Sequence, residues 1–466
     1  MLPFTGKSVL YIIISTMRIR FRPYLLVLIP AVCLLTVLCA AGAYNLPPVH
    51  DRLAWRIDNW RAQIKYALNP PENVVFVPQE PVATIVEATM QAMSRPSATP
   101  TATSTPVPAG PTATPQPSPS PTISPTPLPI LVNLKGVKYE DQHNRWNYCG
   151  PANLSMALTF WGWDGNRDVV GKAIKPSDKD KNVMPYEMVD FVTNDVPGIG
   201  ALLRSGGDID LIRRMVANGF PVLAEKGYYE YDYNGKLGWM GHYQYVTGYD
   251  DTQGTLLVQD TYNDGPNHAI LYPEFIKGWR DFNYVFIITY PLERQAEVLN
   301  LLGPYADANW SYRHAWETAQ EETQRLTGND QFFAWFNVGT SLVNLADYGG
   351  AAAAYDTAFQ VYAQLPEDPV GASATTRPYR MMWYQTGPYF AYYYSARYQD
   401  VINLADNTLL KTISEPVLEE SLYWRAMAKA ALGDTGGAIQ DLQDSLKWHP
   451  GFQPSVAKLQ ELGVNP

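Results

Sequence analysis

The chain has 466 residues and a net charge of -10, and 46% of its residues are hydrophobic. Its length exceeds what one ordinary hydrophobic core holds, so we expect two or three domains. The acidic balance, without a dense run of Lys and Arg, argues against nucleic acid as a partner. With 31 Tyr and 13 Trp, the composition is typical of a packed globular protein outside the N-terminal third.

An uncharged apolar segment covers residues 24–43 and follows three arginines, Arg18, Arg20 and Arg22. About 20 apolar residues suffice to span a bilayer, and basic residues before the span favour a cytoplasmic N-terminus, here residues 1–23. We therefore expect a single-pass cell-membrane protein whose bulk is extracytoplasmic. Residues 41–43 also have the small-x-small form of a signal peptidase site, so a cleaved and secreted protein is the alternative.

Residues 44–93 form a predicted juxtamembrane region. Apolar side chains recur there at helical spacing among basic ones, which predicts an amphipathic helix. This helix lies either on the outer membrane surface or against the next domain, and the sequence leaves both open. The apolar positions are Leu53, Ile57, Trp60, Ile64 and Leu68.

Residues 94–129 consist mainly of Pro, Thr, Ser and Ala, with almost no charged or large apolar side chains. Such a composition cannot bury enough apolar surface to offset the conformational entropy lost on folding. Its prolines favour an extended chain, which would reach roughly 100 Å at about 3.1 Å per residue. We interpret the segment as a disordered stalk that holds an extracytoplasmic domain away from a membrane.

A globular domain is predicted for residues 130–292. Helical patterns come first and strand patterns follow, with turn sequences at 251–254 and 263–266. This order predicts an α+β domain with antiparallel strands. The predicted helices cover 151–161, 185–193 and 208–218, and the predicted strands cover 131–134, 137–139, 221–225, 242–249, 255–260, 269–272 and 284–290.

Cys149 is the only cysteine outside the apolar N-terminal segment, which holds Cys33 and Cys39. It stands two residues before Pro151, and proline is favoured in the first turn of a helix. Cys149 is therefore expected at a helix N-terminus, where the helix dipole favours a reactive thiolate. The alternative is a small buried hydrophobic residue.

A nucleophilic thiolate needs a general base, and the base needs a group that orients it. His242 opens one predicted strand and Asp260 ends the next. If the two strands form a hairpin about the 251–254 turn, His242 lies opposite residues 260–263 and within reach of Asp260. His143 and His268 are the rival bases.

Gln142 precedes Cys149 closely enough for its amide to donate, with the Cys149 backbone N–H, to a developing oxyanion. These residues form the candidate catalytic set: Cys149, His242, Asp260 and Gln142.

Four short motifs, at 148–152, 241–243, 248–250 and 258–260, together resemble the papain-like cysteine peptidases of the bacteriocin-processing, double-glycine peptidase-like family. The resemblance covers about residues 132–290. It implies a papain-like α+β fold in which Cys149 is the nucleophile, His242 the base, Asp260 the orienting residue and Gln142 the oxyanion donor. The connection between Gln142 and Cys149 is longer than is usual in that family.

Residues 293–466 are rich in alanine and have helical periodicity, with the residue spacing of tetratricopeptide-like repeats. The pattern predicts about three helical hairpins and a short last helix at 454–462, with a Thr/Pro/Ala-rich insertion at 366–377. Repeats of this kind bind peptides or protein partners. We interpret most of the aromatic residues here as packing between helices rather than as a binding surface; they are Trp383, Tyr384, Tyr392, Tyr393 and Tyr394.

The sequence as a whole predicts a membrane-tethered extracytoplasmic cysteine peptidase that acts on a peptide or protein, with a repeat domain that binds substrate or a partner. No metal or cofactor is expected. Two alternatives use the same fold. One is a catalytically inactive papain-like module that binds peptides or proteins, and the other is a thiol acyltransferase or amide-ligating enzyme with the same triad.

Overall fold

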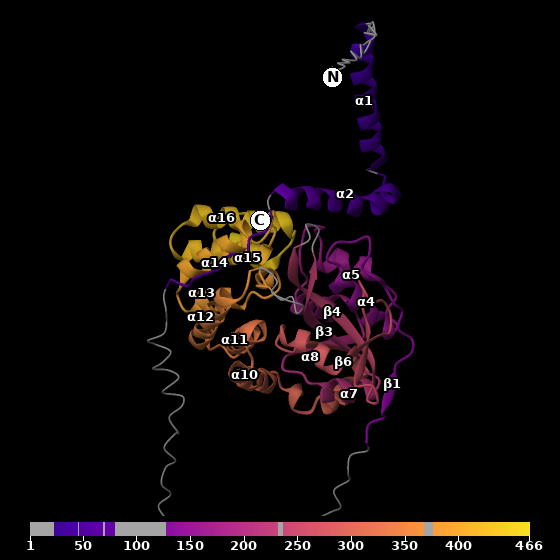
Figure 1. Cartoon of the computed structure of the whole chain (residues 1–466), viewed down its shortest axis with the longest axis vertical. Coiled ribbons are helices and arrows are strands. Elements are labelled where there is room, and N and C mark those ends of the chain that lie inside the picture. Colours follow the sequence, from indigo (N-terminus) through magenta and orange to yellow (C-terminus); the bar gives the residue numbers. More distant parts are fainter. Residues whose placement is uncertain (1–22, 45, 69, 80–126, 232–235, 368–375) are drawn as a thin grey trace, which may run out of the picture. The chain divides into compact units, whose positions relative to one another are not determined.

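The computed structural model describes residues 23–44, 46–68, 70–79, 127–231, 236–367 and 376–466 (Figure 1). These residues belong to two compact units, one ending at Asn59 and one running from Trp60 to Pro466. The predicted cytoplasmic N-terminus and the predicted stalk lie almost wholly outside the described residues.

In the described part, two helices come before the predicted stalk. α1 (Pro23–Tyr44) covers the predicted apolar segment and α2 (Pro47–Leu68) covers the predicted amphipathic helix. Trp60, Ile64 and Leu68 are each more than half exposed. Whether this helix lies on a membrane surface or against the next domain stays a prediction. No helix within the described ranges is both long and apolar enough to cross a membrane. The membrane anchor and the extracytoplasmic location stay predictions.

An antiparallel sheet forms the centre of the α+β region. Its strand order is β2-β7-β3-β4-β5-β6, and β1 pairs with the end of β4. The long β3–β4 hairpin occupies the middle because its side chains are buried on both faces. The strands are β1 (Leu131–Asn133), β2 (Ile199–Arg204), β3 (Val222–Tyr231), β4 (Leu237–Asp250), β5 (Thr255–Gln259), β6 (His268–Leu271) and β7 (Phe286–Pro291).

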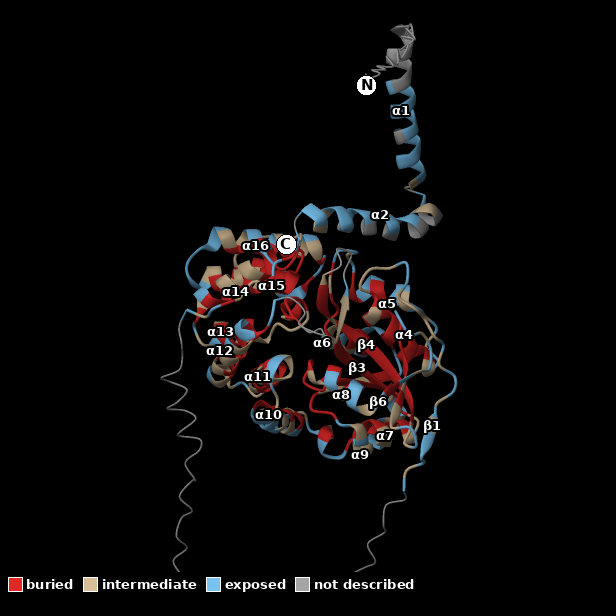
Figure 2. Ribbon diagram, viewed as in Figure 1, coloured by how far each residue is buried: buried red, intermediate tan, exposed pale blue. Residues whose placement is uncertain are grey.

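Helices cover both faces of this sheet (Figures 1 and 2). On one face, Leu223 and Tyr245 of the sheet pack against α4 (Cys149–Phe160), α5 (Arg167–Ile174) and α6 (Pro185–Asp195). On the other face, Val222 and Val246 pack against α7 (Ile209–Ala217), α8 (Tyr272–Arg280) and α9 (Gln295–Leu302). Adjacent residues of one strand thus contribute to two separate cores, as strand geometry requires.

The predicted α+β class with antiparallel strands is confirmed, but the predicted order is wrong in two places. β2 lies between α6 and α7, and α8 lies between β6 and β7. α8 was missed because it follows β6 without a turn and has Pro273 in its first turn, a position that proline favours. The predicted strand at 137–139 is irregular chain whose alternating residues pack on the α4 core instead of pairing. α5 was also not predicted.

The C-terminal region is helical throughout its described part, apart from short connections. The predicted hairpins correspond to three helix pairs, α11/α12, α13/α14 and α15/α16, in which consecutive helices pack together. Gly339 permits close packing of the first pair, because a Cβ there would lie 2.7 Å from the Tyr355 ring. Assignment to tetratricopeptide-like repeats stays a prediction. The elements are η1 (Leu292–Arg294), η2 (Gly303–Ala306), α10 (Ala308–Arg325), α11 (Gly328–Asn344), α12 (Tyr348–Gln364), η3 (Met381–Trp383), α13 (Gly387–Tyr394), α14 (Tyr398–Leu410), α15 (Glu419–Ala431), α16 (Thr435–Trp448) and α17 (Gln453–Glu461).

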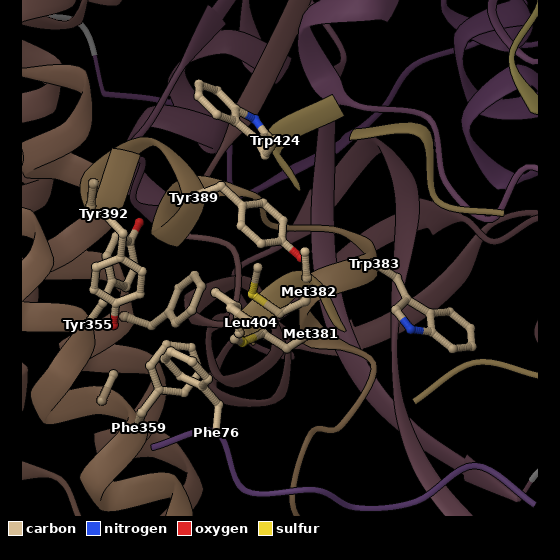
Figure 3. Close-up of a cluster of buried hydrophobic side chains, with 14 of the residues drawn as sticks. Phe76, Tyr355, Phe359, Met381, Met382, Trp383, Tyr389, Tyr392, Leu404 and Trp424 are labelled. Atoms are coloured by element: carbon tan, nitrogen blue, oxygen red, sulfur yellow. The ribbon is translucent and has the colours of Figure 1, made fainter. Parts of the chain in front are cut away.

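Residues 70–79, which precede the stalk in the sequence, pack on this helical region. Phe76 is buried and meets the Phe359 ring edge-on at 5.0 Å (Figure 3). The backbone N–H of Gln79 donates to Asp400 Oδ1 at 2.9 Å. Residues 70–79 of the predicted juxtamembrane region (44–93) therefore belong to the folded unit, and residues 80–93 lie outside the described part. In the same core Trp383 and Tyr392 are buried, which confirms their interpretation as packing residues.

The α+β region and the helical region share part of a core. Trp239 of β4 is fully buried, and its ring stacks on Phe282 at 5.4 Å and lies against Phe333 of α11 at 5.3 Å. The η3 turn also contacts β4, and this strand carries His242. The helical region is thus packed directly behind the candidate catalytic strand.

Candidate active site

Cys149 is the first residue of α4, as the sequence predicts. Asn147 has a φ of 49°, a left-handed conformation that asparagine tolerates, and it turns the chain into the helix. Cys149 itself is half-buried. One turn later the buried Asn153 amide donates to the Cys149 carbonyl and to the Tyr243 carbonyl, each at 2.9 Å. These two bonds fix the start of the helix against β4.

His242 lies on β4, where it pairs with Lys226 of β3. Its side chain is only 6% exposed, and Nε2 is 3.2 Å from Asp260 Oδ2. The other ring nitrogen, Nδ1, is then the atom available to Cys149, and His242 is close enough to lower the pKa of the Cys149 thiol. The preceding residue has to be glycine-sized, because a Cβ at Gly241 would lie 2.6 Å from the Phe282 ring and 2.8 Å from the Tyr384 ring.

Asp260 directly follows β5 and is buried. The β4–β5 register continues from Tyr245 opposite Gln259, so Gln244 lies opposite Asp260. Gln244 Nε2 donates to Asp260 Oδ2 at 2.7 Å. Two backbone N–H groups donate to Oδ1, those of Tyr262 at 2.8 Å and Asn263 at 3.0 Å. The carboxylate is therefore held by three donors besides the imidazole.

These contacts set the ionisation of the three groups. Burial opposes a charged thiolate, but the hydrogen bond and positive charge of His242 outweigh it and lower the pKa of Cys149. Burial likewise opposes imidazolium, yet Asp260 and Cys149 raise the pKa of His242 to about 9. Despite its burial, Asp260 keeps a pKa below the usual range because His242 and Gln244 hydrogen-bond to it. These shifts favour a thiolate–imidazolium pair beside a carboxylate.

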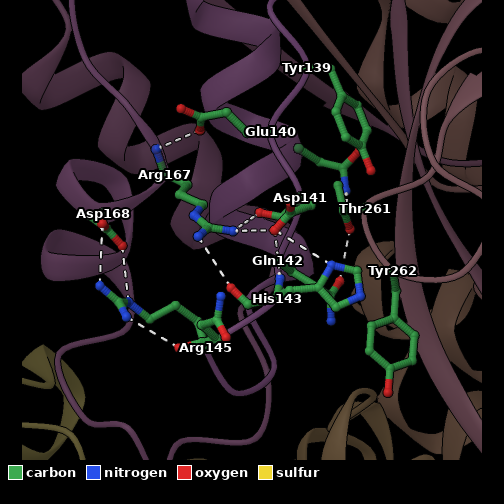
Figure 4. Close-up of polar contacts among 12 residues, drawn as sticks. Tyr139, Glu140, Asp141, Gln142, His143, Arg145, Arg167, Asp168, Thr261 and Tyr262 are labelled. Carbon is green, nitrogen blue, oxygen red and sulfur yellow. Dashed lines mark hydrogen bonds and ion pairs between the residues drawn. The ribbon is translucent and has the colours of Figure 1, made fainter. Parts of the chain in front are cut away.

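Gln142 lies on the loop that precedes Cys149, next to Thr261, which directly follows Asp260 (Figure 4). Its backbone N–H donates to the Thr261 carbonyl at 2.9 Å, and its side-chain Oε1 accepts from Thr261 Oγ1 at 2.8 Å. Because the amide oxygen is turned to Thr261, Nε2 is the atom left to donate elsewhere. The role of oxyanion donor stays a prediction.

Arg167, at the start of α5, holds this loop in position through hydrogen bonds (Figure 4). Its guanidinium bonds the Asp141 carbonyl, the Asp141 carboxylate at 2.9 Å and the His143 carbonyl at 3.2 Å. Its backbone N–H donates to Glu140 Oε2 at 2.7 Å. The loop on which Gln142 stands is therefore positioned by the protein although it has no regular secondary structure.

The rival histidines lie in other surroundings. The His143 side chain is 54% exposed, stacks on Tyr262 at 5.6 Å and has Nδ1 3.5 Å from Asp141. His268 lies on β6 with Nε2 3.6 Å from Asp264. Among the described residues, His242 is the histidine that the geometry joins to both Cys149 and Asp260.

Sequence reasoning gave no role to three residues of the site. Asn153 and Gln244 are the buried amides that hold Cys149 and Asp260. The sequence could have indicated both roles, because residue 153 shares a helix face with residue 149 and residue 244 shares a strand face with residue 242. Glu225 pairs across β3 and β4 with Tyr243 and is 2% exposed, and burial together with the nearby Cys149 charge raises its pKa. The raised pKa of Glu225 favours its neutral form near Cys149.

Residues 134–287 match the model of the Peptidase_C39 like family. The C39-like region contains Cys149, His242, Asp260 and Gln142, and the match confirms the family resemblance at this coarse level. A solved structure of a C39-like peptidase from Bacillus anthracis is similar with 17% identity over 34% of this chain and 97% of that chain, with a TM-score of 0.29. No curated protein matches the chain.

Proposed function

We propose that the C39-like region is an active cysteine peptidase that hydrolyses peptide bonds through Cys149, His242 and Asp260. The observation that carries the proposal is the buried His242–Asp260 contact of 3.2 Å beside a cysteine at a helix N-terminus. A helix N-terminus and a neighbouring imidazolium are two independent ways to stabilise a thiolate. The family match of residues 134–287 supports the same chemistry.

The reaction begins when the Cys149 thiolate attacks the scissile carbonyl carbon and forms a C–S bond. The negative charge moves to the carbonyl oxygen, where the Cys149 backbone N–H and Gln142 Nε2 are the proposed donors. As the C–N bond breaks, imidazolium His242 transfers its proton to the leaving amine. Neutral His242 then takes a proton from water, which attacks the thioester and releases the carboxylic acid and the thiolate.

The helical region is proposed to bind part of the substrate or a protein partner. A cavity of about 410 Å³ lies between the two regions, lined by Lys226 and Tyr228 of β3 and by Asn329 and Phe333 of α11. The Tyr228 ring also meets the His242 ring edge-on at 5.7 Å, so one residue of the cavity lining contacts the proposed base. An extended peptide leaving the catalytic cysteine would reach side chains of both regions. We further propose that residues 24–43 tether this enzyme to a membrane with its bulk outside the cytoplasm.

The test compares the full chain with Cys149→Ala on a peptide library, with products identified by mass spectrometry. Hydrolysis should fall by about 10³-fold or more, because no other group replaces the nucleophile. The matched control replaces the other two thiols, Cys33→Ala with Cys39→Ala, and should cleave like the unaltered chain. Equal cleavage by Cys149→Ala would reject the proposal.

Alkylation of Cys149, together with analysis of the products, distinguishes the proposed peptidase from the two alternatives, an inactive binding module and an acyltransferase. At neutral pH iodoacetamide should modify Cys149 faster than Cys33 and Cys39, as judged by peptide mapping. Fast alkylation with peptide binding but no cleavage would identify an inactive binding module. Products in which the acyl group is joined to an added amine, rather than to water, would identify an acyltransferase.

A further inference from the structure

A second group of buried ionisable side chains lies where the loop between α5 and α6 meets the helical region. Asp180 comes from that loop, Glu419 opens α15, and His449 follows α16. Their side chains are 3%, 3% and 10% exposed. We call these three residues the junction cluster. It is separate from the catalytic triad and no part of the proposed peptidase chemistry uses it.

The three ligand-type atoms converge. His449 Nδ1 is 3.1 Å from Glu419 Oε1 and 3.7 Å from Asp180 Oδ2, and one such atom of each residue lies within 4.8 Å of the others. Metal–ligand bonds of about 2.0–2.2 Å at tetrahedral angles would separate neighbouring ligand atoms by about 3.3–3.5 Å. The two measured separations lie on either side of that spacing, so a small ion fits among the atoms with little movement.

An independent observation points to a missing ligand. Asp180 Oδ2 is buried and has no hydrogen-bond partner, whereas Oδ1 accepts from the Asn182 N–H at 3.1 Å. A buried carboxylate oxygen without a donor costs free energy, and native proteins usually satisfy such atoms. The unsatisfied oxygen is the one that lies toward His449.

Further carboxyl groups are buried around the cluster. Glu420 is buried next to Glu419, and Glu187 lies nearby, so four carboxyl groups gather at this junction. The nearest buried cation is Lys175, whose ammonium donates to the Ser177 carbonyl at 3.0 Å and forms no ion pair with the described carboxylates. A bound cation would supply the positive charge that this site lacks.

We propose that Asp180 Oδ2, Glu419 Oε1 and His449 Nδ1 bind one divalent cation of the zinc type. A histidine with two carboxylates is a ligand set that zinc accepts, and the fourth position would be taken by water. No metal was expected from the sequence, so the proposal departs from that expectation.

The position of the cluster gives the cation a structural role. The Asp180 loop is tied to the helical region by the Lys179–Glu415 ion pair at 2.8 Å as well as by the cluster. On its other side the loop supports the nucleophile. The Asp180 carbonyl accepts from Asn147 at 3.3 Å, and the Val183 carbonyl accepts from Tyr243 at 2.8 Å. A cation bound here would clamp the helical region to the loop that supports the start of α4.

Zinc binding is best measured on the full chain carrying Cys149→Ala, so that the catalytic thiolate cannot capture the metal. After dialysis against zinc chloride and then against metal-free buffer, we expect about one zinc per chain. We also expect a rise in Tm of roughly 3–8 °C at a zinc concentration about 100 times the Kd. Manganese and calcium chloride, tested in parallel, should give smaller rises because the imidazole ligand favours zinc.

Matched variants assign the ligands. In the same background Glu419→Gln and His449→Gln should lose the retained zinc and the zinc-dependent rise in Tm. Without metal, Glu419→Gln should melt at the same temperature as its parent or higher, because it removes one acidic group from a buried cluster of carboxyl groups. His314→Gln, which alters a half-buried histidine of α10, should bind zinc like the parent. Retention of zinc by Glu419→Gln, or no zinc bound by the parent, would overturn the proposal.

Discussion

Among the described residues, two buried histidine–carboxylate pairs have nearly equal length, and the pKa values of their carboxyl groups are shifted in opposite directions. His242 and Asp260 are 3.2 Å apart, and His449 and Glu419 are 3.1 Å apart. All four side chains are at most 10% exposed. The pKa of Asp260 lies below its usual range, whereas that of Glu419 is raised well above it. Distance and burial alone therefore do not decide the charge of such a pair.

Hydrogen-bond donors explain the difference. Asp260 receives the Gln244 amide and two backbone N–H groups in addition to the imidazole. Each donor stabilises the charged form, and together they outweigh the cost of burial. Glu419 instead lies among Asp180 and Glu420, whose charges oppose its own. In the first pair the protein itself supplies the donors that stabilise the carboxylate. In the second pair a proton or a bound metal ion would have to stabilise it.

The largest expected effect comes from removing the imidazole of the completed pair. His242→Asn should lower kcat/KM for peptide hydrolysis by roughly 10³–10⁴-fold, because it removes the acid and base and the cation that stabilises the thiolate. Alkylation of Cys149 at pH 7 should also slow toward the rate of an ordinary cysteine. His314→Asn is the control and should leave both rates unchanged. Full activity in His242→Asn would mean that the first pair is not catalytic.

Removing the charge of Asp260 should have a smaller effect and a specific pH signature. In the unaltered chain activity should be lost as pH rises through about 9, where His242 loses its proton, and as pH falls below the lowered pKa of Cys149. Asp260→Asn removes a carboxylate that raises the pKa of His242, so the alkaline limit should move to lower pH. We expect a loss of about 10²-fold in kcat at pH 8. An unchanged alkaline limit would show that Asp260 does not set the charge of His242.

The first pair could be predicted from sequence because its members lie on neighbouring strands of one hairpin. The turn at 251–254 fixes the register, which shifts by one residue at a bulge between Val246 and Gly248. With that shift Asp260 lies opposite Gln244, and His242 reaches it from two positions away. The predicted range of 260–263 was wide enough to include this geometry. The position of Cys149 at a helix N-terminus could be predicted because the residue that favours a helix start, Pro151, lies close to it in the sequence.

The second pair could not be predicted, because its residues come from distant parts of the chain. Asp180, Glu419 and His449 each stand in a sequence that resembles an exposed loop or helix end. Only the packing of the helical region on the Asp180 loop buries them together. The same limit applies to residues 70–79, which have no periodic pattern and are ordered by contacts with α12 and α14. Local sequence patterns predict helices and strands. Contacts between elements that are far apart in the sequence can be known only from the folded structure.

The smallest effect tests whether the donors to Asp260, rather than burial, distinguish the two pairs. Gln244→Met keeps the shape of the side chain but removes the 2.7 Å bond to Asp260 Oδ2. Gln259→Met is the matched control, because Gln259 is also buried at the β4–β5 ladder but donates to Thr247 and Asn267. Both variants should lose about 1–3 kcal/mol of stability, since each leaves buried polar partners unsatisfied.

Only Gln244→Met should also affect catalysis. With one donor fewer, Asp260 orients His242 less well, so kcat should fall by about 10-fold while KM stays the same. A less firmly held carboxylate stabilises imidazolium less, so the alkaline limit should shift to lower pH, though by less than in Asp260→Asn. Equal pH profiles for the two variants would show that Gln244 contributes only packing. The difference between the two histidine pairs would then have to come from the repulsion among the junction carboxylates alone.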